Sequence, residues 1–146
     1  MAETGKRDDP FPQYNFRVEI DGVARAGFTE CSGLTTDTDT VDYREGNDVG
    51  MHVRKLAGPR KNQNVIFKRG ITKDRSLWEW RKSIINGAVK RRNASIILLD
   101  EDRKEVLRWH VREAWITKWD GGSLNAKTSD VMIETIELAH EGLELV

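Results

Sequence analysis

A long alternation of apolar and polar side chains between Lys104 and Trp119 strongly limits what this chain can form. The apolar positions fall on one side of the period-two pattern: Leu107, Trp109, Val111, Trp115 and Trp119. Cationic residues and a histidine fall on the other: Arg108, His110, Arg112 and Lys118. Successive side chains of a strand point to opposite faces, so the pattern predicts a long strand with one core face and one wet face.

Shorter strands are predicted on both sides of it. Apolar and polar residues alternate from Tyr14 to Ile20, and Asp21-Gly22 is a two-residue hairpin signal, so Val23 to Phe28 is predicted to be the returning strand. Thr35 to Tyr43 alternates β-branched residues with aspartates, which predicts a strand with little apolar content on either face. Three further segments complete the set: Val65 to Lys68, Ala94 to Leu99 and Val131 to Ala139.

Only one segment has a helical pattern, from about Ser76 to Asn86. Ser76 with Glu79 three residues later predicts a capping box, and Gly87 is placed to end the helix. Five apolar residues are predicted to join the helix to the sheet: Leu77, Trp80, Ile84, Trp109 and Trp115. A surface on which the tryptophans stack a ligand is the alternative interpretation.

The predicted fold is mainly β: an antiparallel two-sheet sandwich or barrel with one packed α-helix, because strands do not alternate with helices. The length of 146 residues predicts a single domain over 1–146. Two segments lack partners within one subunit, a charged and proline-broken arm at 1–12 and a long loop at 45–64 that is interrupted by glycines.

Composition narrows the function classes. Lys and Arg number 24 and Asp and Glu number 24, so no net field attracts the chain to nucleic acid or to an anionic membrane. Cys31 is the only cysteine and excludes an internal disulfide. The opening residues lack the apolar segment of a signal peptide, and the longest apolar run, Ile96 to Leu99, is far too short to span a bilayer, so we expect synthesis in the cytoplasm and no membrane anchor.

The residue patterns do not predict a catalytic, cofactor or metal site. His52, His110 and His140 are dispersed and have no metal-ligand spacing. Asp37 and Asp39 share a strand face and so resemble the paired carboxylates of a glycosidase, but a solvated or pore-facing strand explains them more simply. The basic run Lys90 to Arg92 has two explanations: contact with phosphate, or its position directly after a helix C-terminus, where cations are favoured. We therefore predict that the chain is not an enzyme.

The order of short motifs resembles the tail-tube (inner tube) proteins of contractile phage tails and phage-tail-like contractile injection systems. The matching blocks span nearly the whole chain: Asp9–Phe11, Tyr14–Ile20, Phe28–Leu34, Tyr43–Gly46, Lys55–Gly58, Lys68–Thr72, Leu77–Trp80 and Glu137–Leu143. The resemblance implies a fold similar to the type VI secretion ring protein, and a structural subunit whose hexameric rings stack into a hollow tube inside a sheath. The polar strand Thr35 to Tyr43 agrees with this, since a lumen would give it water to face.

The resemblance also implies partners: further copies of the chain, the sheath protein, baseplate and tube-terminating proteins, and a luminal cargo of protein effector or DNA, found in the assembled particle. Whether the particle is a phage tail or a headless injection system stays open. A tube-initiator ring of the baseplate is the alternative within the class, and a small β-barrel enzyme or ligand-binding protein is the alternative outside it. Residues around the 45–64 loop are the candidates for ring stacking: Arg44, Glu45, Asp48, Met51, Arg54, Lys55, Arg60 and Lys61.

Overall fold

The computed structural model describes residues 9–21, 23–47, 49–50 and 52–146, which form ten strands and one helix. The first six strands are β1 Phe16–Ile20, β2 Val23–Ala26, β3 Glu30–Ser32, β4 Thr36–Tyr43, β5 Arg54–Asn62 and β6 Val65–Gly70. The remaining elements are α1 Ser76–Ile85, β7 Arg92–Leu99, β8 Glu105–Asp120, β9 Ile133–Ala139 and β10 Gly142–Leu145.

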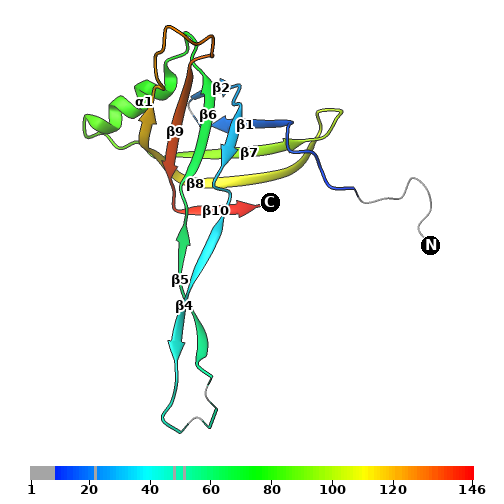
Figure 1. Cartoon of the computed structure of the whole chain (residues 1–146), viewed down its shortest axis with the longest axis vertical. Coiled ribbons are helices and arrows are strands. Elements are labelled where there is room, and N and C mark those ends of the chain that lie inside the picture. Colours follow the sequence, from blue (N-terminus) through cyan, green and yellow to red (C-terminus); the bar gives the residue numbers. More distant parts are fainter. Residues whose placement is uncertain (1–8, 22, 48, 51) are drawn as a thin grey trace, which may run out of the picture.

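All strand pairs are antiparallel, and β8 is shared by two sheets (Figure 1). The first half of β8 lies between β7 and β10 in a sheet that continues through β1 to β2. Its second half pairs with β9 in a sheet that continues through β6 to β3. A mainly β, two-sheet architecture with one helix is therefore confirmed.

A bulge in β8 makes the corner between the two sheets. Val111 pairs with Ala94 and Ala114 with Arg92, so β8 has an extra residue here, and Glu113 has a φ of 53°. The extra residue reverses the alternation, and Ala114 and Ile116 continue the fully buried row of Val111. The prediction of one unbroken apolar face is therefore wrong at Trp115, which is half-buried and lies between the buried Ala114 and Ile116, out of their row.

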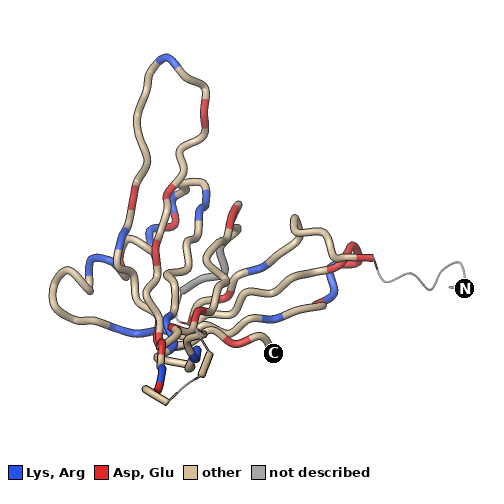
Figure 2. The backbone as a smooth tube through the Cα atoms, turned by 60° about the horizontal axis from the view of Figure 1, so that its bottom comes forward, with Lys and Arg blue, Asp and Glu red and all other residues tan. Residues whose placement is uncertain are grey.

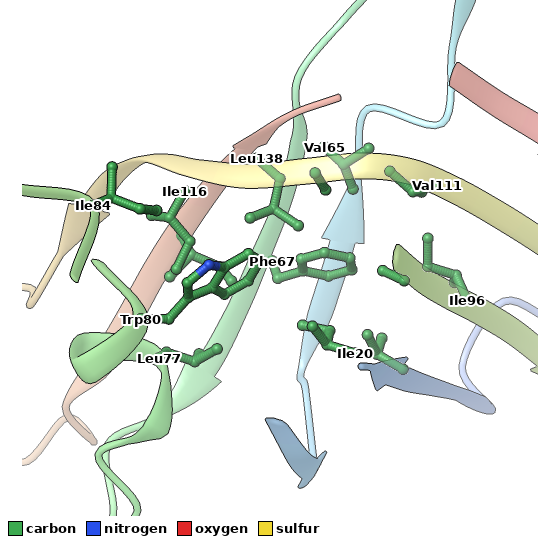
Figure 3. Packing of buried hydrophobic residues seen from close by; sticks show 14 residues of the cluster. Ile20, Val65, Phe67, Leu77, Trp80, Ile84, Ile96, Val111, Ile116 and Leu138 are labelled. Carbon is green, nitrogen blue, oxygen red and sulfur yellow. The ribbon is translucent and has the colours of Figure 1, made fainter. Parts of the chain in front are cut away.

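The hydrophobic core fills the angle between the sheets, and α1 closes it (Figure 3). Leu77, Trp80 and Ile84 on α1 are buried and face the side chains of Ile116 and Leu138. The other two predicted contact residues, Trp109 and Trp115, are half-buried against the same cluster. The Trp80 indole N–H donates to the Lys90 carbonyl at 2.9 Å, so the polar group of this buried side chain has a hydrogen-bond partner.

The helix starts and ends where predicted, but the predicted capping box is wrong. The N-cap is Arg75, so Ser76 lies inside the helix and the capping box with Glu79 does not form. Instead the Ser76 amide donates to Asp74 Oδ1 at 3.0 Å, which satisfies one of the free N–H groups of the first turn. Gly87 terminates the helix with a φ of 92°, a conformation that glycine adopts without strain.

The prediction of a long loop over 45–64 is wrong for residues 54–62. They form β5, which pairs with β4 over its whole length, from Thr36 opposite Asn62 to Tyr43 opposite Arg54. The apolar spacing that marks a strand is absent because both faces of β5 are exposed. The predicted arm at 1–12 lies outside the described residues up to residue 8, and residues 9–12 have no helix or strand.

Candidate assembly surfaces

The β4–β5 hairpin projects from the body as a two-stranded ribbon (Figure 1). In the described part of the chain its strands pair only with each other, and nearly all of their residues are exposed. A two-stranded hairpin is at best marginally stable alone in water. The ribbon is therefore a candidate surface for contact with other subunits.

The ribbon has two different faces. Val41 lies directly opposite Leu56, and alternation places Tyr43 and Arg54 on the same face. Val41 is 47% and Leu56 is 46% exposed, so this cross-strand apolar pair is open to solvent. Alternation places Thr36, Thr38 and Thr40 on the opposite face, which is suited to water. Only the apolar face has a hydrophobic reason to be covered.

Ion pairs cross the ribbon. Lys55 Nζ lies 2.6 Å from Asp42 Oδ1, and Lys61 Nζ lies 3.2 Å from Asp39 Oδ2. Both pairs are well exposed, so each stabilises the ribbon only slightly. In the body of the molecule, basic and acidic residues are interspersed along the backbone (Figure 2).

A bulge bends the ribbon near its middle. Thr38 pairs with Arg60 and Thr40 with Ala57, so Gly58 and Pro59 together oppose Asp39. A Cβ at Gly58 would lie 2.9 Å from the Asp39 carbonyl oxygen, which explains glycine at this position. Bulges increase strand twist, and here the bulge sets the direction of the outer half of the ribbon.

The tip of the ribbon, residues 44–53, is held by polar contacts at its base. The Tyr43 hydroxyl donates to Glu45 Oε1 at 2.9 Å, and an Arg44 N–H donates to the Gly50 carbonyl at 3.2 Å. Val49 is fully exposed. The structure places the predicted stacking residues at the tip (Arg44, Glu45), at the start of β5 (Arg54, Lys55) and near its end (Arg60, Lys61), whereas Asp48 and Met51 lie outside the described residues.

A buried ionic cluster was not predicted from the sequence. Arg69 on β6 and Glu134 on β9 are 4% and 5% exposed and form an ion pair through Nε and Oε1. The Trp119 indole N–H donates to Glu134 Oε2 at 3.0 Å, and Arg69 also bonds Asp74 at 3.2 Å. The hydrogen bond from the Ser76 amide is the main reason that the pKa of Asp74 lies below its usual value. The cluster ties the sheet to the start of α1.

An open hollow of about 700 Å³ lies between β1, β7 and β3, and Cys31, Leu34, Ile96 and Trp109 contribute to its lining. Burial raises the pKa of the Cys31 thiol to about 12, so Cys31 is a poor nucleophile at neutral pH. Within the described ranges, no group of three or more His, Cys, Asp or Glu side chains could hold a metal ion. No helix of the described residues is long and apolar enough to cross a bilayer.

Comparison with family models identifies the chain. Residues 12–144 match the model described as T4-like virus tail tube protein gp19. The chain belongs to this family. The resemblance inferred from the sequence motifs is thereby confirmed, and the chain is a tail tube protein of contractile injection systems.

Chains in solved structures of contractile injection systems match nearly the whole of this chain. One comes from the PVC sheath-tube complex of an extracellular contractile injection system in its extended state, with a TM-score of 0.86, 26% identity, and coverage of 95% of this chain and 93% of that one. Another comes from the tube-terminating cap of the anti-feeding prophage, with a TM-score of 0.86, 26% identity, and coverage of 100% and 99%. No curated protein sequence gives a significant match.

A more distant match concerns the fold alone. Hcp1 from Flavobacterium johnsoniae has a TM-score of 0.58 at 12% identity, and the alignment covers 89% of this chain and 93% of that one. The expected similarity to the type VI secretion fold is thereby confirmed.

Proposed function

We propose that this tail tube protein forms hexameric rings that stack into the hollow inner tube of a contractile particle. The observation that carries the proposal is the family match over residues 12–144, together with a β4–β5 ribbon that has no partner strand among the described residues. The subunit has no catalytic role: the sheath does the work of contraction, and the tube transmits force and encloses cargo.

Rings close by pairing of sheet margins between neighbouring copies. In the described structure, β2, β3 and β10 are edge strands of the two sheets, and the ribbon adds two more unpaired edges. Unpaired edges expose backbone donors and acceptors and invite uncontrolled association unless a specific partner covers them. A heterologous contact repeated around an axis pairs one edge of each copy with another edge of the next copy and closes a circle.

Rings stack through the ribbon tip and the N-terminal arm. The tip, residues 44–53, presents an exposed Val49 and includes Arg44 and Glu45, and the segment around Phe11 and Tyr14 is also exposed. A stacking contact is heterologous and never closes, so one chain makes both discs and filaments. The partners of the finished tube are the sheath, the baseplate, a terminating protein, and a cargo of effector protein or DNA.

Shortening the tip tests the stacking mechanism. Residues 44–53 are replaced by Asn-Gly, which can join Tyr43 to Arg54 as a tight turn and leaves the pairing of β4 with β5 intact. We expect rings without tubes by negative-stain electron microscopy of the purified protein. The matched control carries Glu101→Ala and Asp102→Ala in the exposed β7–β8 turn and should form tubes. Tubes of normal length from the shortened protein would remove the tip from the mechanism.

A tube-initiator ring of the baseplate is the second candidate function. It is favoured by a chain in the solved baseplate of the anti-feeding prophage, which shares the fold of this chain with a TM-score of 0.84 at 21% identity. Labelling the subunit in intact particles separates the two functions, since a main tube protein is labelled along the whole tube and an initiator only at its base.

A further inference from the structure

The charges of the ribbon are separated by strand. β4 carries Asp37, Asp39 and Asp42 and no basic residue. β5 carries no acidic residue and four basic ones: Arg54, Lys55, Arg60 and Lys61. One margin of the ribbon is therefore acidic and the other basic.

Both margins are open to a further strand. In the part of the chain that the structure describes, β4 and β5 pair only with each other, so each has one edge without a strand neighbour. The bulge shifts the inner register, so that Gly58 and Pro59 together oppose Asp39, and Pro59 is the one residue of β5 without a backbone N–H to donate. Edges of this kind accept a strand from another copy through backbone hydrogen bonds.

The internal ion pairs leave the charges available to such a strand. The side chains of Asp42 and Lys55 remain 61% and 63% exposed although their charged atoms lie 2.6 Å apart. A carboxylate has about four acceptor sites and an ammonium three donors, so each group can hold a second partner. A neighbouring copy that brings the opposite charge adds favourable contacts on the free side.

The charge separation distinguishes two ways of pairing ribbons. A two-fold dimer would place β4 against β4, or β5 against β5, and so oppose like charges, which destabilises cross-strand contacts. Rotation about a ring axis places β5 of one copy against β4 of the next and opposes unlike charges. It also continues the antiparallel order, since β4 and β5 run in opposite directions.

We propose that the acidic β4 edge of each ribbon pairs with the basic β5 edge of the ribbon in the next copy around the ring, and that this charge pattern selects ring closure over two-fold dimers. The inference rests on the proposed function, because it names the lateral partner of the ribbon within the ring. The apolar face of the ribbon takes no part in this choice of direction.

A charge swap separates contacts within one ribbon from contacts between ribbons. The swapped protein exchanges three charges of each strand: Asp37→Lys, Asp39→Lys, Asp42→Lys, Lys55→Asp, Arg60→Asp and Lys61→Asp. The net charge is unchanged, and each internal ion pair is kept with the charges of its two partners exchanged. Arg54 is unchanged because it lies over the Tyr43 ring, 6.0 Å from its centroid. If the six-fold variant does not fold by circular dichroism, the pair Asp42→Lys with Lys55→Asp replaces it.

We expect the swapped protein to form rings alone but to exclude wild-type subunits. When the two are mixed as monomers, native mass spectrometry should find mixed rings at least about tenfold below the statistical proportion, since wild-type β5 would meet a basic β4. Raising the salt concentration should increase mixing by screening the repulsion. The control, Glu105→Arg with Arg108→Glu, exchanges an ion pair at the start of β8, outside the ribbon, and should mix statistically with wild type.

Two results would overturn the inference: statistical mixing of wild-type and swapped subunits, or a folded swapped protein that forms no rings, because its β5 would then face a surface outside the ribbon. Wild-type protein without annular or tubular species is a separate result. It would refute the proposed function and the inference together, whereas the first two results leave the proposed function intact.

Discussion

The buried Arg69–Glu134 pair offers a quantitative test of the core. Both side chains are almost completely buried, and Glu134 also accepts from the Trp119 indole. Arg69→Met would leave the Glu134 carboxylate buried without its cation, which costs about 3–5 kcal/mol. At about 2–4 °C per kcal/mol for a chain of this size, the melting temperature should fall by roughly 10 °C.

The double variant Arg69→Met with Glu134→Leu should recover part of this loss. Replacing both partners leaves no buried charge. The remaining penalties are the Trp119 N–H without an acceptor, about 1–3 kcal/mol, and the loss of the bonds from Arg69 to Asp74. The double variant should therefore be more stable than Arg69→Met alone, and the coupling energy of the two sites should be about 3 kcal/mol.

Urea unfolding followed by tryptophan fluorescence measures these free energies, at two protein concentrations so that assembly does not add to stability. Lys68→Met is the matched control, because Lys68 is the neighbour of Arg69 but is exposed, 3.7 Å from Glu30. It should change stability by less than about 1 kcal/mol. An Arg69→Met penalty below about 1 kcal/mol, or strictly additive single variants, would refute the reasoning.

Three further predictions concern separate sites. Gly33→Ala should destabilise the protein by at least about 2 kcal/mol, since φ is 86° and a Cβ would lie 2.2 Å from the Asn64 carbonyl oxygen; Gly27→Ala, with open space around it, should do much less, and equal urea midpoints would contradict this. Cys31, with a pKa of about 12 instead of 9.0, should react with a thiol reagent at pH 8 about 1000-fold more slowly than in urea, and equal rates would show that burial does not protect it. Folding lowers the pKa of Asp74, so the contribution of Asp74 to stability is present above pH 3.8 and is lost as the pH falls through the folded pKa. The stability difference between wild type and Asp74→Asn should therefore shrink on acidification. A difference that stays constant with pH would exclude this linkage.

The sequence by itself determined the elements that depend on local pattern. The hairpin at Asp21 joins β1 to β2 with Ile20 opposite Val23, and α1 ends at Gly87. Turn and capping signals lie within a few residues of their effects, so they can be read without knowing the fold. The ordered motifs that resemble tail tube proteins are also a property of the sequence, and the family match confirms them.

Only the tertiary structure decided the contacts that join distant parts of the chain. The bulge at Glu113 depends on how β7 pairs with β8, and it is what moved Trp115 out of the buried row. β5 has no apolar alternation and becomes a strand because β4 lies beside it. Arg69 and Glu134 are separated by 65 residues and form a pair only when β6 lies against β9. Pairing between strands is non-local, and the pattern within each strand does not record its partner.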